Sequence, residues 1–433
     1  MTAIAEGGMA AVLARRWRDP AAWTTTVDVC AILLAASLPW STSLVGIFAT
    51  AMLLTRLPFL DLAALWRLAR RPICAVPIAL FALAAIGMLW SDADWAARTY
   101  AVKPAAKLLF LPILFYHFQR SERGPWVLIA FLVSCVLLEA ASWLVAFAPS
   151  MTMKPHGFET RGVVVKDYID QSQEFALCAL ALVYPVIQLF RAKRFWQAAL
   201  LAAIAFSFVA NMAFVIVSRT ALVTMPIMVA VFGLVHLRWR TNLMILAGAA
   251  VLGAVAWVAS PQLESTVATF SSDYRQYKET GRATSIGERL EFWQKSLRFV
   301  GEAPLFGHGT GATRGLFEKA AEGQTGAAAT VIGNPHNQTL NVAVQWGALG
   351  VVVLYAMWLV HLLLFRGEGL INWIGLLVVV QNIFTSLFNS HVFDFHEGWM
   401  YVLGVGIAGG IALKVLKTDA SASVQSPGHG TGR

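Results

Sequence analysis

The feature that most constrains the fold of this chain is a series of apolar runs, each of a length that can cross a lipid bilayer. A membrane-spanning helix needs roughly 20 mainly apolar residues, and somewhat fewer where the span is short or tilted. Twelve runs meet this description, at residues 27–40, 41–55, 72–90, 105–118, 126–147, 171–190, 195–217, 221–237, 242–259, 339–365, 370–388 and 399–416. We therefore predict an all-α, polytopic integral membrane protein with about twelve transmembrane helices.

Composition supports this class and excludes a soluble one. Of the 433 residues, 58% are hydrophobic and 13% are charged, and the mean hydropathy is +0.64. These charges are too few to cover a soluble globule of this size. The four cysteines all lie in apolar segments without CxxC or Cys/His spacing. We interpret them as small buried hydrophobic residues and expect neither a disulfide framework nor a zinc site.

The positions of the basic residues predict the orientation of the chain. A net charge of +9 could suggest a nucleic-acid partner, but Lys and Arg fall in short clusters between the apolar runs. That distribution is typical of the positive-inside rule, so we expect no nucleic-acid partner. With twelve spans the clusters share one side, expected to be cytoplasmic; they include residues 15–18, 56–71, 120–123, 191–194, 238–240, 366 and 414–417.

The division of the chain follows from this topology. We expect a cytoplasmic segment at residues 1–26 without a signal cleavage site, helices 1–9 over residues 27–259, and a large, partly helical external loop at 260–338. Helices 10–12 would cover residues 339–416, and the polar tail at 417–433 would be a disordered cytoplasmic segment. The external side also carries an acidic turn at Asp92 and Asp94 and a loop at 148–170.

Within the large loop, Ser285 and Glu288 have the spacing of a capping box. A helix is therefore predicted from about residue 286 to 300, stopped by Gly301 and Pro304. One face of this helix would carry Arg289, Phe292, Trp293 and Ser296. The glycine-rich turn that follows, at residues 306–311, lacks the GK[ST] of a P-loop and follows no strand, so we expect no nucleotide site.

Three arginines are candidates for anion binding because they lie at the external rim, outside the cytoplasmic clusters. Arg219 interrupts two apolar runs, Arg289 lies on the loop helix, and Arg161 lies in the loop before the sixth span. An arginine beside the hydrocarbon boundary usually has a fixed anionic partner or a function, although snorkelling to lipid head groups is the alternative. Guanidinium groups suit phosphate and pyrophosphate oxygens.

His336 is the candidate for proton transfer. It follows a Gly, Asn and Pro sequence that interrupts the backbone, and it precedes a polar patch that includes Asn337 at the start of the tenth span. Histidine exchanges protons near neutrality. A single histidine at a membrane rim is nevertheless more often a structural residue.

Other ionisable residues are open to a functional or a structural interpretation. Glu139 and Glu174 are acids within apolar runs, which are functional candidates unless an arginine pairs with them. His391 and His396 flank acidic residues at the external turn before the last span. This spacing is not diagnostic of a metal site, and we expect none.

Together these motifs resemble a known family. His336 and Asn337, followed after nine intervening residues by Gly347, resemble the His-[Asn/Ser/Gln]-x9-Gly signature at the end of the periplasmic loop of bacterial O-antigen ligases (WaaL type). The Arg219 turn, the loop helix from Arg289 to Trp293, and the turn at residues 304–309, which contains His308, are also similar to the core that O-antigen polymerases and ligases share.

The resemblance implies a bacterial inner-membrane glycosyltransferase with its active site on the periplasmic side. It would transfer a glycan from undecaprenyl pyrophosphate to the lipid A-core, with inversion and without metal, nucleotide or other cofactor. Its partners would be these two lipids and the surrounding membrane lipids. Arg219 and Arg289 would hold the pyrophosphate, and His336 would act at the acceptor hydroxyl. The other positions expected to contact substrate are Arg161, Asn337, Trp293, Glu139 and His308.

Three other functions stay open. An O-antigen polymerase would use the same donor with a lipid-linked glycan as acceptor, and a protein O-glycan ligase would differ only in its acceptor. A lipid or solute transporter is the more distant alternative. The sequence shows neither inverted repeats nor paired broken helices, and its charges gather at one rim and not at the midplane.

Overall fold

The structure confirms an all-α polytopic membrane protein. The computed structural model describes residues 19–154, 161–236 and 239–425, and the regular elements within these ranges are all helical. Eight of the described helical segments are long and apolar enough to cross a membrane, and three shorter apolar helices accompany them, at Ala21–Ser37, Arg219–Val235 and Leu370–Thr385. With α13 (Trp239–Ala259), each predicted span contains a helix.

The spanning elements follow one another in chain order. They are α2 (Pro20–Ser37), α3 (Thr42–Arg56), α5 (Pro72–Ile86), α6 (Trp95–Val102) with η3 (Lys103–Leu109) and α7 (Phe110–Phe118), α8 (Gly124–Phe147), α9 (Tyr168–Ala181) with α10 (Val183–Arg191), α11 (Phe195–Phe214), α12 (Arg219–His236), α13, α17 (Gln338–Leu364), α18 (Leu370–Thr385) and α19 (Phe395–Gln425). Between the spans lie η1 (Leu57–Phe59), α4 (Leu62–Ala69), η2 (Gly87–Trp90), η4 (Pro149–Met151), α14 (Pro261–Thr280), α15 (Ser285–Glu302), α16 (Thr313–Ala321) and η5 (Gly326–Ala329).

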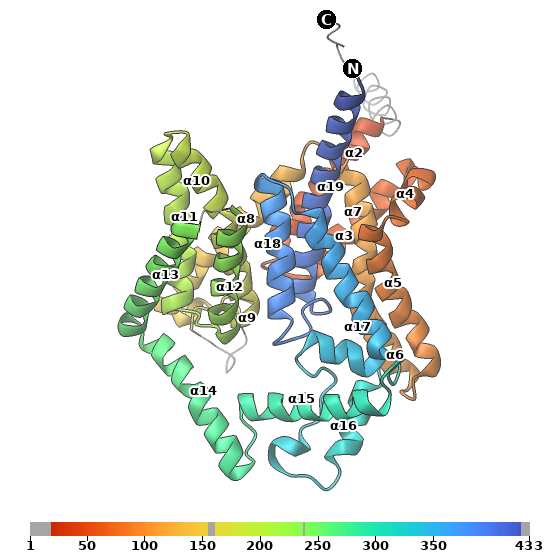
Figure 1. Ribbon diagram of the computed structural model, residues 1–433, viewed down its shortest axis with the longest axis vertical. Helices are drawn as coiled ribbons and strands as arrows, with labels where there is room; N and C mark the ends of the chain where they lie inside the picture. The colour runs from red at the N-terminus through yellow and green to blue at the C-terminus, as the bar shows by residue number, and fades with distance from the viewer. Residues whose placement is uncertain (1–18, 155–160, 237–238, 426–433) are drawn as a thin grey trace, which may run out of the picture.

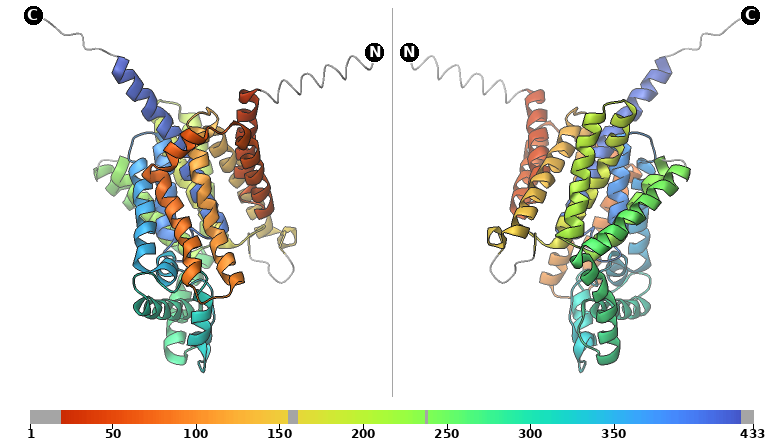
Figure 2. Two further views of the ribbon diagram at one scale, coloured as in Figure 1. Left: turned by 90° about the vertical axis from the view of Figure 1, so that its right-hand side faces the viewer. Right: turned by 90° about the vertical axis from the view of Figure 1, so that its left-hand side faces the viewer.

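The two ends of the molecule differ. The described chain begins with α2 and ends with α19 at the upper end in Figure 1, while α14, α15 and α16 lie together at the lower end. Helix α15 lies across the bundle, and the side views in Figure 2 show the same segregation. The large loop is therefore on the opposite side from both ends of the described chain, as an even number of crossings requires.

The core of the bundle forms around α19, which packs most extensively against α7 and also contacts α18 and α8. Small residues make this close approach feasible. A Cβ added at Gly406 would lie 2.6 Å from Cβ of Leu114, and one added at Gly410 would lie 2.6 Å from Cβ of Phe118. Helices in membranes associate through such small residues because packing replaces the hydrophobic driving force.

Helix α17 is kinked at Gly347, where φ is 59° and ψ is −154°. Only glycine adopts this region without strain. The position also has no room for a side chain, because an added Cβ would lie 2.4 Å from the carbonyl carbon of Leu305. The glycine of the signature is thus required by a break in the helix that carries His336 near its start.

The turn after α15 satisfies the backbone groups that this break exposes. In a regular helix Ala348 and Leu349 would donate to Val344 and Gln345. Instead Ala348 N donates to Pro304 O (2.8 Å) and Leu349 N to Leu305 O (3.3 Å). In return, the carbonyl of Val344 accepts from His308 N (2.9 Å) and that of Gln345 from Gly309 N (2.8 Å). The glycine-rich turn therefore fixes the large loop to α17.

The predicted helix boundaries are wrong at three places. The N-cap of α15 is Thr284 and not Ser285, because the Thr284 hydroxyl accepts from Gly287 N at 3.1 Å. Helix α2 begins within the predicted N-terminal segment, where Asp19 caps it. Helix α19 continues to Gln425, into the tail expected to be disordered, because no Gly or Pro interrupts helix propagation before Pro427. Residues 1–18 and 426–433 lie outside the described part.

Candidate functional site

The candidate site lies where the large loop meets the lower ends of the spans. Arg219 is the first residue of α12, Arg289 lies on α15, and His336 precedes the first residue of α17. The charge of Arg219 lowers the pKa of Arg289, and the charge of Arg289 lowers the pKa of His336. The structure thus places Arg289 within electrostatic range of both Arg219 and His336.

Arg219 has a fixed anionic partner that the sequence did not reveal. Its Nη1 donates to Asp273 Oδ2 at 3.3 Å, and its Nη2 donates to Thr269 Oγ1 at 2.5 Å. Both partners lie on α14, and the guanidinium also stacks on the ring of Phe270 at 4.9 Å. Since a guanidinium has five N–H donors, Arg219 retains donors for an anion after these contacts.

Arg289 differs from Arg219 in its ionic partners. Among the described residues no carboxylate forms an ion pair with it. Burial lowers the pKa of its guanidinium, the nearby Tyr168 raises it, and Arg219 lowers it again. Because arginine stays protonated in proteins, two cations that are close together here create a local demand for negative charge.

The backbone of His336 is held in an unusual conformation, with φ of 51°. A residue other than glycine in this left-handed region costs of order 1–3 kcal/mol, which the surroundings must offset. Asn334 supplies part of that support, because its Oδ1 accepts from His336 N at 3.0 Å. The strain orients the imidazole, which also packs beside the ring of Phe292 with centroids 6.1 Å apart.

The hydrogen bonds around His336 determine which ring nitrogen carries the proton. Because Asn334 Oδ1 accepts from the His336 backbone, Asn334 Nδ2 is the group that faces Asn389, and it donates to Oδ1 there at 3.1 Å. The same Asn389 Oδ1 lies 2.9 Å from His336 Nδ1. An amide oxygen only accepts, so Nδ1 carries the hydrogen and Nε2 presents a lone pair.

Electrostatics keep this imidazole neutral. Burial lowers the pKa of His336, the hydrogen bond to Asn389 raises it, Arg289 lowers it and Glu288 raises it. The net shift is downward from the ordinary value of 6.5. At neutral pH the ring is therefore unprotonated at Nε2, as a general base requires.

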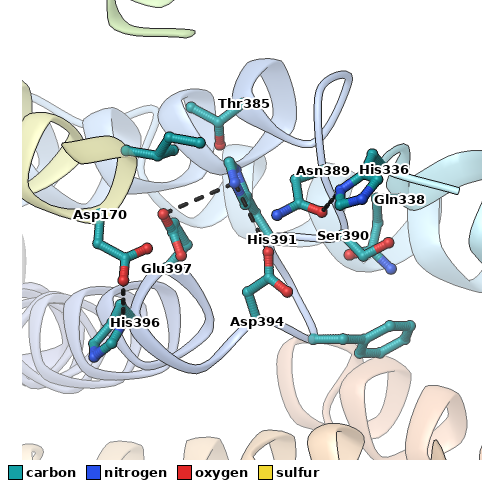
Figure 3. A network of polar contacts seen from close by, with 12 residues as sticks. Asp170, His336, Gln338, Thr385, Asn389, Ser390, His391, Asp394, His396 and Glu397 are labelled. Carbon is teal, nitrogen blue, oxygen red and sulfur yellow. Dashed lines mark hydrogen bonds and ion pairs between the residues drawn. The ribbon is translucent and has the colours of Figure 1, made fainter. Parts of the chain in front are cut away.

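A chain of polar side chains connects His336 to the kink of α17, and Figure 3 shows its first contact, between His336 and Asn389. Asn334 Oδ1 also accepts from Ser390 Oγ (2.7 Å), and Ser390 Oγ accepts from Asn341 Nδ2 (3.0 Å). Asn341 Oδ1 then accepts from Gln345 Nε2 at 3.0 Å. The position of the imidazole therefore depends on the segment between α18 and α19, residues 386–394, which we call the α18–α19 loop.

The α18–α19 loop also carries a second group of ionisable residues. His391 Nε2 lies 3.9 Å from Asp394 Oδ2 and 3.8 Å from Glu397 Oε1, and Asp170 Oδ2 lies 2.5 Å from His396 Nδ1. Burial lowers the pKa of His391 to about 3, although Asp170 raises it. Burial raises the pKa of Asp394 to about 7, with Lys107 lowering it and Asp170 raising it.

The other residues predicted to contact substrate have structural partners instead. Asn337 caps α17, with Oδ1 accepting from Leu340 N (3.0 Å) and Nδ2 donating to Leu387 O (3.1 Å). His308 Nε2 lies 2.8 Å from Phe299 O, at the end of α15. Trp293 packs in the small apolar cluster of the large loop. These contacts give the three residues a structural role in the large loop and at its junction with α17. Contact between these residues and substrate stays a prediction.

Among the described residues, neither Glu139 nor Arg161 contacts His336. Glu139 is buried in α8, where its carboxylate accepts from Ser207 Oγ at 3.0 Å and lies 3.4 Å from Trp143 Nε1. Arg161 is exposed in the turn that follows residues 155–160, which are not described. Neither residue contributes to the pKa shifts of Arg289 and His336.

Sequence reasoning missed the residues that orient the site, namely Asn334, Asn389, Ser390 and Asp273. Asn389 and Asp273 contact the predicted residues across separations of 53 and 54 positions. The only local signal was the polar character of residues 386–394 between two apolar runs. Periodicity does not reveal which distant amide meets a histidine.

Comparison with known proteins finds a family that is similar to this part of the chain. Residues 204–355 match a family model described as O-antigen ligase, and this segment contains Arg219, Arg289 and His336. This match supports membership of the chain in the superfamily of O-antigen ligases and polymerases. An uncharacterized protein of Haemophilus influenzae is 28% identical over 143 residues, which are 32% of this chain. The match spans about a third of that relative's length, 36%. The segment that matches the O-antigen ligase family thus holds the arginine pair, the loop helix and the kinked helix.

Proposed function

We propose that this protein transfers a glycan from undecaprenyl pyrophosphate to a sugar hydroxyl of the lipid A-core. The observation that carries the proposal is the neutral His336, with its Nε2 lone pair, near enough to Arg289 for that charge to lower its pKa, in the segment that matches the O-antigen ligase family. The expectation of an inner-membrane enzyme with a periplasmic site is part of the same proposal. The large loop and the candidate site would face the periplasm.

The arginine pair would hold the donor. The pyrophosphate leaving group gains charge as the bond between the anomeric carbon and the phosphate oxygen breaks, and guanidinium donors fixed in advance stabilise that charge. Arg289 has no carboxylate partner among the described residues, so the pyrophosphate would supply its counter-charge. Arg219 would bind with the donors that Asp273 and Thr269 leave free.

His336 would activate the acceptor. As the acceptor oxygen forms its bond to the anomeric carbon, the hydroxyl proton moves to Nε2, and Nδ1–H stays bonded to Asn389. A sugar hydroxyl has a very high pKa, so the base acts chiefly as the transition state forms. Attack from the face opposite the pyrophosphate inverts the anomeric carbon.

A cavity of about 1140 Å³, whose lining includes Asn334 but not His336 itself, is suited to the acceptor. Asn334 and Ser390, which orient His336, form part of its wall. The rest of the lining includes aromatic rings and cations, among them Tyr100, Trp399, Lys103 and Arg314. Aromatic faces suit sugar rings, and cations suit an acceptor glycan that carries anionic groups.

The experiment that tests the proposal is a reconstitution with purified protein in detergent. Undecaprenyl pyrophosphate glycan and lipid A-core are incubated with the protein, and the conjugate is detected as a shift on a gel. We expect conjugate with the wild type and little with folded His336→Ala or Arg219→Ala protein. Full transfer by both variants would show that the mechanism is wrong.

Other products would identify the alternatives. Longer lipid-linked glycan would indicate a polymerase, and glycan attached to an added pilin-like protein would indicate a protein O-glycan ligase. A transporter would give no product in detergent, where no gradient exists.

A further inference from the structure

We propose that His391, Asp394 and Glu397 bind one divalent transition-metal ion, Zn²⁺ or Mn²⁺, on the wall of the acceptor cavity. This departs from our expectation from sequence that the chain has no metal site. The proposal is independent of the transferase reaction, in which the ion takes no step.

The geometry of three ligand atoms carries the proposal. His391 Nε2, Asp394 Oδ2 and Glu397 Oε1 all lie within 4.8 Å of one another, and Nε2 is 3.9 and 3.8 Å from the two oxygens. These two distances are too long for hydrogen bonds. Two metal bonds of about 2.1 Å can span at most about 4.2 Å, so one ion can join Nε2 to either oxygen. Figure 3 shows the three side chains pointing toward one another.

Two of the ligand atoms, and the second nitrogen of the histidine, also lack hydrogen-bond partners. Asp394 Oδ2, Glu397 Oε1 and the remaining nitrogen of His391, Nδ1, are buried without a hydrogen bond from any described residue. The side chains of His391 and Glu397 are only 1% and 6% exposed. Buried polar atoms are almost always satisfied, and converging unsatisfied atoms call for an ion or water.

Lys107 lowers the pKa of Asp394 but forms no ion pair with either acid. Lys107 Nζ donates to the backbone carbonyls of Phe393 and Asp394, not to the carboxylates. His396 is engaged with Asp170 at 2.5 Å. Glu397 also contacts the carboxyl of Asp170, so a shared proton could relieve that one pair. Such a proton would leave Asp394 Oδ2 and His391 Nδ1 without a partner.

The ligand set indicates the class of ion. An imidazole favours Zn²⁺ and other late first-row ions, whereas two carboxylates also suit Mn²⁺. Asp394 is 29% exposed and lines the cavity, so water can complete the coordination. The ion would tie the α18–α19 loop to α19 and thereby hold Asn389, which sets the tautomer of His336.

Metal content is measured on the full-length protein, purified in detergent with a tag that binds no metal. After dialysis we expect about one Zn²⁺ or Mn²⁺ per chain by elemental analysis. Stripping with a chelator should lower Tm, and adding ZnCl₂ or MnCl₂ should restore it. Glu397→Gln and Asp394→Asn should weaken binding at least about tenfold and abolish the metal-dependent shift in Tm.

The control is Glu139→Gln, which removes a buried carboxylate from α8 and should leave metal binding unchanged. Glu397→Gln also separates metal loss from unfolding, because removing one of several neighbouring acids should raise the Tm of the stripped protein. Wild-type protein that neither retains nor takes up either ion would overturn the proposal. Equal affinity in Glu397→Gln and wild type would do the same. Neither measurement uses transferase activity, so the two proposals can fail separately.

Discussion

At the scale of single residues, His336 depends on a partner in another segment. Its neutral state follows from burial and from Arg289, while its tautomer follows from Asn389. The left-handed backbone at His336 is stabilised through Asn334. Arg289, Asn389 and Asn334 thus together prepare the imidazole for proton transfer.

The pH dependence of turnover tests this arrangement. The reactive form is the neutral ring, so turnover should be constant near neutrality and fall only as pH drops through a pKa below 6.5. Asn389→Asp adds a negative charge, which raises the pKa of His336 and should move this acid limb to higher pH. Asn389→Ala removes the hydrogen bond that raises the pKa of His336, so turnover of this variant should fall only at a lower pH. The measurement is kcat against pH, and identical acid limbs in the three proteins would contradict the role of His336.

Arg289 should matter more than an exposed arginine of the same loop. Arg289→Ala should lower turnover by about a hundredfold or more, as expected for a donor to a developing charge. Because Arg289 lowers the pKa of His336, this variant should also move the acid limb to higher pH. Arg282→Ala, at an exposed position, is the matched control. Similar rates for the two variants would exclude Arg289 from donor binding.

At the scale of elements, the kink of α17 joins the large loop to the membrane bundle. The turn at residues 304–309 exchanges backbone hydrogen bonds with both sides of the break. Glycines are needed where this turn approaches other backbone, since a Cβ added at Gly309 would lie 2.5 Å from Cα of Ser91. The loop is therefore placed by backbone contacts as well as by its own apolar cluster.

Gly347→Ala tests the kink. Forcing a side chain into this left-handed conformation costs about 1–3 kcal/mol, and the approach to Leu305 adds a clash. We expect a clear fall in Tm and loss of transfer activity. Gly46→Ala, in helix α3 with no atom within 4 Å of the added Cβ, should keep or slightly raise Tm. A Tm for Gly347→Ala equal to that of Gly46→Ala would contradict the geometry.

At the scale of the whole molecule, the large loop and the two ends of the described chain lie on opposite sides. The large loop lies at one end, and both ends of the described chain lie at the other (Figure 1). The positive-inside rule then favours a periplasmic position for the loop and the site.

Cysteine labelling in cells tests the orientation. All four native cysteines are buried, so the background should be low. Glu322→Cys, exposed after α16, should react with a membrane-impermeant maleimide in cells with a permeabilised outer membrane. Arg71→Cys, exposed before α5, should react only after the inner membrane is disrupted. The opposite pattern would reverse the proposed orientation.

The sequence by itself determined the positions of the spans, the size of the large loop and the choice of Arg219, Arg289 and His336. These depend on hydropathy and charge, which are local properties of the chain. Only the tertiary structure decided that Asn389 fixes the tautomer of His336, that Asp273 pairs with Arg219 and that the glycine-rich turn binds the kink of α17. Such contacts join residues far apart in the chain, and their formation depends on how the helices pack, which no local pattern encodes.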